Sequence, residues 1–127
     1  MIKLLVVEDN AIVRRGLISI LEREQDIIIT GEAENGVDAL SLLNTGTIAT
    51  MVLADLNMPV MDGIELTTAI HKVFPYINVV VLTMHAKQDF VTKAKQAGAR
   101  GFLLKHLNSD ELVDALRRIA KGAMIFM

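Results

Sequence analysis

An uncharged apolar run that stops at a carboxylate constrains this chain more than any other feature. Residues 51–54 are Met, Val, Leu and Ala, Asp55 follows directly, and Pro59 comes four residues later. A short apolar run bounded by a turn signal is typical of a strand buried on both faces. Proline cannot continue a central strand, so the chain has to leave the sheet there. We therefore predict that Asp55 lies at the carboxyl end of a buried strand, the edge where open parallel sheets bind ligands.

Apolar runs alternate with amphipathic stretches five times along the chain. Strands are expected at residues 2–7, 27–30, 51–54, 77–82 and 100–104. The intervening helices are marked by apolar residues at helical spacing: Val13, Leu17, Ile20 and Leu21; Val37, Leu40 and Leu43; Leu66, Ile70 and Val73; Phe90, Val91, Ala94 and Ala97; Leu112, Leu116 and Ile119. Arg14 falls outside the apolar stripe of its helix. Such alternation predicts an α/β fold, a doubly wound five-stranded parallel sheet in the flavodoxin-like order 2-1-3-4-5 with helices on both faces.

Composition narrows the class of protein. A chain of 127 residues with 52% hydrophobic and 22% charged residues fits one globular domain, expected at 1–122 with an apolar tail at 123–127. A net charge of -2 and the lack of a Lys and Arg cluster argue against direct binding of nucleic acid. The absence of cysteine excludes disulfides and thiolate metal sites. With no signal peptide or membrane-length run, we expect a soluble cytoplasmic domain without a membrane partner.

Two further carboxylates are expected beside Asp55. Glu8 and Asp9 directly follow the first strand, which neighbours the third strand in the predicted order. Three converging negative charges repel one another, and a hard divalent cation such as Mg²⁺, held by carboxylates and water, offsets that repulsion. Helix capping is an alternative explanation of Glu8 and Asp9, although it does not account for Asp55.

A hydroxyl and an ammonium group are expected at the same edge. Thr83 ends the fourth strand and Lys105 ends the fifth. Taken singly, the first is an ordinary turn residue and the second an ordinary solvated charge. Together, the hydroxyl of Thr83 and the ammonium group of Lys105 can bind a tetrahedral dianion that is attached to one of the acids. An aspartate can attack phosphorus and form an acyl phosphate, so the set favours phosphoryl transfer to Asp55.

These motifs resemble the receiver domain of two-component response regulators, from Lys3 to Lys121. The segments that carry the resemblance are Val-Glu-Asp at 7–9, Ala-Asp-Leu-Asn-Met-Pro at 54–59, Met-Asp-Gly at 61–63, Leu-Thr at 82–83 and Gly-Phe-Leu-Leu-Lys at 101–105. Leu-Thr-Met-His at 82–85 and Gly-Phe-Leu-Leu-Lys at 101–105 are most similar to the branch whose regulators carry a helix-turn-helix DNA-binding output domain.

The resemblance implies a metal-dependent phosphoacceptor site. Asp55 is implied as the phosphoacceptor, and Asp9, Asp55 and the backbone carbonyl of Asn57 as ligands of Mg²⁺ or Mn²⁺. Glu8 is expected to act on the ion through water. A histidine kinase or histidine phosphotransfer protein is the implied donor. The domain is thus expected to be a signalling phosphoacceptor rather than an enzyme, although it promotes its own phosphotransfer and dephosphorylation.

The resemblance also implies a switch. Thr83 and Lys105 are expected to contact the phosphoryl group. Phe102 is expected to turn inward when Thr83 moves toward the phosphoryl group. The switching face is formed by the fourth helix, fifth strand and fifth helix. Phosphorylation is expected to favour a homodimer and to control a transcriptional output domain, absent from this chain, that alone would contact DNA.

Three positions depart from the commonest receiver pattern. His106 follows the lysine where many receivers have proline, which leaves the isomer of that peptide bond open. Met84 is bulky where many receivers have a small residue, and Phe102 lacks the hydroxyl of tyrosine. The histidines His71, His85 and His106 are expected at the surface and not as a metal set.

Other classes of protein share parts of this pattern. A flavodoxin-like FMN carrier has the same strand order, but the acids after the first strand would repel its phosphate. A metal-dependent phosphohydrolase normally needs a second aspartate two residues after the nucleophile, where this chain has Asn57. A phosphorylation-independent interaction module on the same scaffold is the third alternative.

Overall fold

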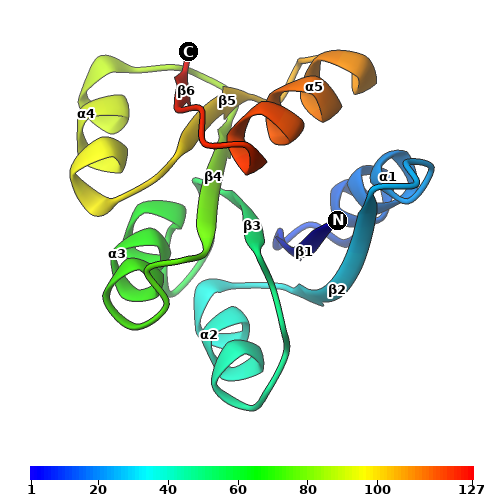
Figure 1. The fold of residues 1–127 in the computed structure, drawn as a ribbon. Helices are drawn as coiled ribbons and strands as arrows, with labels where there is room; N and C mark the ends of the chain where they lie inside the picture. The colour runs from blue at the N-terminus through cyan, green and yellow to red at the C-terminus, as the bar shows by residue number, and fades with distance from the viewer.

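Six parallel strands and five helices build the domain, described over all 127 residues by a computed structural model. The strands are β1 (Ile2–Val7), β2 (Ile27–Ala33), β3 (Met51–Asp55), β4 (Asn78–Thr83), β5 (Gly101–Leu104) and β6 (Ile125–Phe126). The helices are α1 (Ala11–Leu21), α2 (Gly36–Asn44), α3 (Gly63–Val73), α4 (Gln88–Ala97) and α5 (Ser109–Ala120). The sheet order is β2-β1-β3-β4-β5-β6, with α1 and α5 on one face and α2, α3 and α4 on the other (Figure 1). No helix combines the length and apolar character that a membrane crossing requires.

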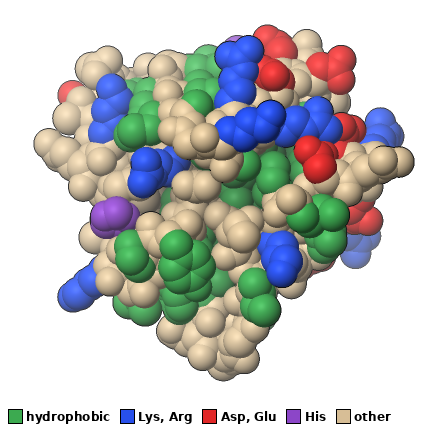
Figure 2. Space-filling view, in the orientation of Figure 1, with side chains coloured by type: hydrophobic (Ala, Val, Ile, Leu, Met, Phe, Trp, Pro, Cys, Tyr) green, Lys and Arg blue, Asp and Glu red, His purple; other side chains and the backbone are tan.

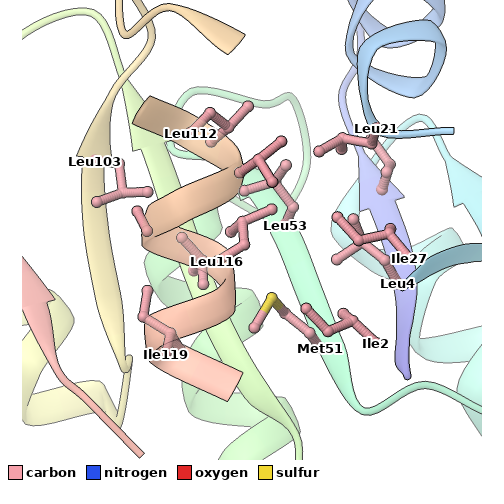
Figure 3. Packing of buried hydrophobic residues seen from close by; sticks show 14 of the residues in the cluster. Ile2, Leu4, Leu21, Ile27, Met51, Leu53, Leu103, Leu112, Leu116 and Ile119 are labelled. Carbon is pink, nitrogen blue, oxygen red and sulfur yellow. The ribbon is translucent and has the colours of Figure 1, made fainter. Parts of the chain in front are cut away.

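The central strand is buried on both faces, as its sequence predicts. Every residue of β3 is buried, and alternate side chains enter different clusters: Met51 and Leu53 pack with α1 and α5, whereas Val52 and Ala54 pack with α2 and α3. Figure 3 shows the first cluster, in which side chains of α5 such as Leu116 point toward the strands. Burial on both sides fixes the strand end, and therefore the place of the residue that terminates it.

The sheet has one strand more than the five expected from the sequence. The backbone N–H of Ile125 donates to the carbonyl of Arg100 at 3.1 Å, and that of Met127 donates to the carbonyl of Phe102 at 3.0 Å. Gly122, at a φ of 109°, reverses the chain after α5 and returns it to β5. Phe126 packs against the cluster that contains Phe102. The amino-acid sequence of the tail does not show a strand pattern, because a strand of two residues is too short to produce one.

In α1 and α2 the predicted apolar stripe faces the core except at one position each. Val13 and Val37, expected inside, are 39% and 48% exposed, whereas Arg14, expected outside the apolar stripe, is only 9% exposed. Val73 at the end of α3 is also exposed. Positions one residue apart differ by only about 100° around a helix, so a polar residue with buried partners can shift the phase of the inner face.

Ion pairs connect α5 with the loop that follows α1. Arg117 lies 2.7 Å from Glu24 and 2.8 Å from Asp26. The hydrogen bond from Arg117 holds the pKa of Asp26 below its usual value. In Figure 2, basic and acidic side chains lie beside one another over the region where Figure 1 places α1 and α5. These partly buried pairs join two elements that also share the apolar cluster of Figure 3.

We predict that Phe126→Ala lowers the free energy of unfolding by about 1–2 kcal/mol, less than a fully buried phenylalanine costs, because the ring is only partly covered. The matched control is Met124→Ala, which alters a side chain that is 56% exposed. Urea denaturation of both variants measures the difference. Equal stabilities of the two variants would show that the packing of the Phe126 ring contributes nothing.

Candidate functional site

Three carboxylates meet at the carboxyl edge of the sheet. Val7 of β1 pairs with Ala54 of β3, so the residues that follow these positions emerge side by side. Carboxylate oxygens of Glu8, Asp9 and Asp55 lie within 4.8 Å of one another. Glu8 and Asp55 are buried, at 2% and 6% exposure, while Asp9 is exposed. The convergence predicted from the strand order is confirmed.

Lys105 enters this cluster from β5. Its ammonium group lies 2.8 Å from Glu8 Oε1 and 3.1 Å from Asp55 Oδ1. The backbone N–H of Lys105 donates to the carbonyl of Thr83 at 2.8 Å, which holds the start of the β5–α5 loop against β4. Lys105 thus points at the acids, as its place at a strand end predicts, and offsets part of their charge.

Burial and neighbouring charges act in opposite directions on these groups. Burial raises the pKa of Glu8, the hydrogen bond from Lys105 offsets only part of that rise, and Asp9 and Asp55 add to it. Burial lowers the pKa of Lys105, but hydrogen bonds to Glu8 and Asp55 outweigh it and the net pKa is raised. One ammonium group is therefore too little positive charge for three carboxylates.

The hydroxyl of Thr83 has a local partner. It donates to the carbonyl of His85 at 3.1 Å and accepts from the backbone N–H of His85 at 3.3 Å. Thr83 itself is 2% exposed at the end of β4. To donate to a group on Asp55, the hydroxyl has to give up its bond to the His85 carbonyl.

The positions that depart from the common receiver pattern are resolved as follows. Every peptide bond is trans, including that between Lys105 and His106. Met84 is 57% exposed. Phe102 is fully buried, so the ring already occupies an inward position. His71, His85 and His106 are exposed, as expected.

Close backbone contact holds α3 against the end of β3. Gly63 donates to the carbonyl of Leu56 at 2.9 Å, and a Cβ at Gly63 would lie 2.6 Å from the carbonyl oxygen of Asp55. Asp62 and Glu65 form a capping box at the start of α3. The intervening loop leaves the carbonyl of Asn57 without a hydrogen bond from the protein.

Sequence reasoning missed one polar residue of the site. Arg14 on α1 donates through Nη1 to the backbone carbonyl of Glu8 at 2.6 Å and through Nε to Glu32 at 2.9 Å. Helical periodicity gave no signal for it, because an arginine beside an apolar stripe normally lies in solvent. Its buried position depends on acceptors from Glu8, which follows β1, and from Glu32 of β2.

The donor set fits a hard divalent cation. Carboxylate and carbonyl oxygens with open access to water are the ligands that Mg²⁺ prefers. Glu8, Asp9 and Asp55 supply the carboxylates. The carbonyl of Asn57, free of other partners, is a further oxygen donor in the adjoining loop.

A doubly wound parallel sheet with acids and a lysine at its carboxyl edge defines the receiver class of signalling domain. Residues 4–117 match the model of the response regulator receiver domain. The chain therefore belongs to the response regulator receiver domain family.

Relatives agree with the branch expected from the motifs. The chain is 36% identical over 125 residues to the response regulator protein VraR of Staphylococcus epidermidis, covering 98% of this chain and 59% of that protein. It is 31% identical over 121 residues to the transcriptional regulatory protein DegU of Brevibacillus brevis, covering 95% of this chain and 51% of that protein. The chain thus spans little more than half the length of these curated relatives.

A solved structure shows the same fold. A LuxR-family two-component response regulator from Aurantimonas sp. SI85-9A1 superposes with a TM-score of 0.92 at 31% identity, covering 98% of this chain and 89% of that one. Together with the relatives, this similarity makes the chain a receiver domain of the LuxR type of response regulator.

We predict that Lys105→Met makes the metal-free protein less stable at neutral pH, by roughly 1–3 kcal/mol, because Glu8 and Asp55 lose their cationic partner. The pKa of Glu8 in the folded protein already lies above its unfolded value. Ionisation of Glu8 therefore lowers the free energy of unfolding as the pH rises from the unfolded pKa toward the folded pKa. Without Lys105 that pKa rises further. The free energy of unfolding should therefore fall more steeply between pH 4.5 and neutrality, which urea titrations at several pH values measure.

Added Mg²⁺ should restore part of the stability that Lys105→Met removes, since it supplies charge to the same acids. Parallel pH profiles of the parent and the variant would contradict the assignment of Lys105 as the partner of Glu8.

We predict that Gly63→Ala destabilises the protein although alanine normally favours a helix by about 1 kcal/mol. The new Cβ meets backbone atoms of Asp55 and Leu56, which cannot rotate away. Gly16→Ala is the matched control, because no atom outside its own helix lies within 4 Å of a Cβ there. Thermal unfolding should show a lower midpoint for the first variant and a higher one for the second.

Proposed function

We propose that this domain is the phosphoacceptor of a two-component system and that Asp55 receives the phosphoryl group. The observation that carries the proposal is a buried aspartate at the carboxyl edge of the sheet, contacted by Lys105 and flanked by two more acids. A carboxylate that is partly neutralised and fixed at a strand end is well placed for nucleophilic attack on phosphorus.

The covalent step exchanges one bond to phosphorus for another. An Asp55 carboxylate oxygen forms the new bond to phosphorus, and the bond between phosphorus and the donor breaks. The donor is the phosphorylated imidazole of a histidine kinase or of a histidine phosphotransfer protein. The donor's ring nitrogen leaves with the electron pair of the broken bond and takes up a proton. Lys105 offsets charge on the transferring group.

Asp9, Asp55 and the carbonyl of Asn57 would hold Mg²⁺ or Mn²⁺, with Glu8 acting through water. When bound, the ion offsets negative charge on the phosphoryl oxygens. The support for this assignment is the cluster of oxygen donors and the shortage of positive charge around them. The same set lets the domain promote its own phosphotransfer and dephosphorylation, without being an enzyme acting on other substrates.

Phosphorylation would act as a switch through two changes of partner. The hydroxyl of Thr83 would leave the carbonyl of His85 for a phosphoryl oxygen, and Lys105 would follow the new negative charge. Shifting an equilibrium from 1:99 to 99:1 needs about 5.5 kcal/mol. A few charge-assisted hydrogen bonds at about 1.5–3 kcal/mol each are sufficient. The affected face is α4, β5 and α5, with Phe102 in its core.

The output of the switch is proposed to be transcriptional and to act in the cytoplasm. Support comes from the similarity to DegU and to a LuxR-family regulator. In this proposal residues 1–122 form the body of the receiver, and phosphorylation favours a homodimer. The segment 123–127, which pairs with β5 through Ile125 and Phe126, leads on toward an output domain. Contact with DNA would belong to the output domain alone.

The test is incubation of the chain with acetyl phosphate and Mg²⁺ followed by intact-mass measurement. The parent should gain one phosphoryl group, Asp55→Asn should gain none, and the exposed-site control Asp114→Asn should behave like the parent. Omission of the divalent ion should abolish labelling. Persistent labelling of Asp55→Asn would refute the phosphoacceptor, and no labelling of the parent would favour a phosphorylation-independent interaction module.

A further inference from the structure

A second cation contacts the loop that carries Glu8 and Asp9: Arg14 of α1 donates to the backbone of Glu8, whereas Lys105 contacts the side chains of Glu8 and Asp55. The side chain of Arg14 is 11% exposed, although it belongs to a helix that borders solvent. A buried guanidinium is costly unless acceptors surround it. Arg14 borders an open hollow together with Glu32, Glu34 and Asp38, yet it directs Nη1 inward, to the backbone carbonyl of Glu8.

That carbonyl belongs to the peptide bond between Glu8 and Asp9. Since a peptide unit is planar, a bond that fixes its oxygen also fixes the orientation in which the chain enters Asp9. The other side of the short loop is held by Asn10, whose side chain caps α1 by accepting from Ile12 and Val13. Arg14 therefore completes the attachment of the two acids to the scaffold.

The two hydrogen bonds of Arg14 use different nitrogens of one planar group. Nη1 donates to the carbonyl of Glu8, directly after β1, and Nε donates to Glu32 of β2. A lysine carries the same charge on a single nitrogen and cannot reproduce this fork. The exposed Glu32 partner orients the guanidinium, while the buried carbonyl is the contact that reaches the site.

We propose that Arg14 is a positioning residue for divalent-cation binding, acting through the Glu8–Asp9 peptide. This inference rests on the proposed metal-dependent function of the same acids. Groups that orient metal ligands typically change metal affinity by about 10–100-fold when they are removed. Arg14 touches neither the ion site's carboxylates nor the reacting atoms, so its effect is on ligand geometry.

Charge and geometry predict opposite effects for loss of Arg14. A cation near the acids repels Mg²⁺, so on Coulombic grounds its removal should tighten binding. Loss of the carbonyl anchor should weaken binding, because Asp9 is no longer held in place. Arg14→Lys keeps the charge and removes the fork, and it therefore isolates the geometric contribution.

The experiment is titration of the metal-free chain with Mn²⁺, with the free ion measured by electron paramagnetic resonance. We expect Arg14→Lys and Arg14→Met to raise the dissociation constant by about 10-fold or more. The matched control Glu32→Gln keeps the guanidinium and the carbonyl acceptor, and it should change the constant by less than about twofold. Urea denaturation of each variant verifies that it is folded at the titration temperature.

Tighter binding by Arg14→Met, unchanged binding by Arg14→Lys, or equal weakening by Glu32→Gln would each overturn the inference. The parent chain separates this inference from the proposed function. A parent that does not bind Mn²⁺ overturns both, whereas a parent that binds, with Arg14 variants that bind equally well, overturns only the role of Arg14.

Discussion

Repulsion among the carboxylates at one edge of the sheet is the constraint on which the rest of this structure depends. Parallel strands that end in register bring Glu8, Asp9 and Asp55 together, and burial strengthens the repulsion between them. Lys105 offsets part of this repulsion, because its ammonium group contacts two of the acids directly. That single ammonium leaves a site that is folded and fixed but still short of positive charge, which is the electrostatic condition for taking up a cation.

The rest of the fold holds these mutually repelling carboxylates in fixed positions. β3 is buried on both faces, and the close approach of Gly63 locks α3 against its end. Thr83, by contrast, holds its hydroxyl in a local bond to His85, which a stronger acceptor can replace. The site thus combines a fixed carboxylate, Asp55, with a hydroxyl donor, Thr83, that can change its partner. The adjustable part adjoins β5, where Phe102 and the tail strand share one apolar cluster.

Predictions from the sequence agree best with the structure where an apolar run ends at a polar residue. The strands that lead to Asp55 and Lys105 were recognised because burial on both faces leaves an uninterrupted apolar run, and strand order then places their ends together. The buried face of a helix is harder to predict. Arg14 and Val13 are adjacent in the sequence, and helical periodicity does not show which of the two has a buried partner. The two-residue strand β6 was missed because pairing with β5, and not its own pattern, creates it.

The amino-acid sequence by itself determined the α/β class, the order of the main strands and the set of acidic, hydroxyl and ammonium groups at the carboxyl edge. Those features follow from hydrophobic periodicity and from the rules of parallel connections, which are local or topological. Only the tertiary structure decided that Arg14 is buried against the carbonyl of Glu8, that Thr83 bonds to His85, and that the tail joins the sheet. These contacts depend on the relative placement of side chains and backbone from separate elements, which no single stretch of sequence specifies.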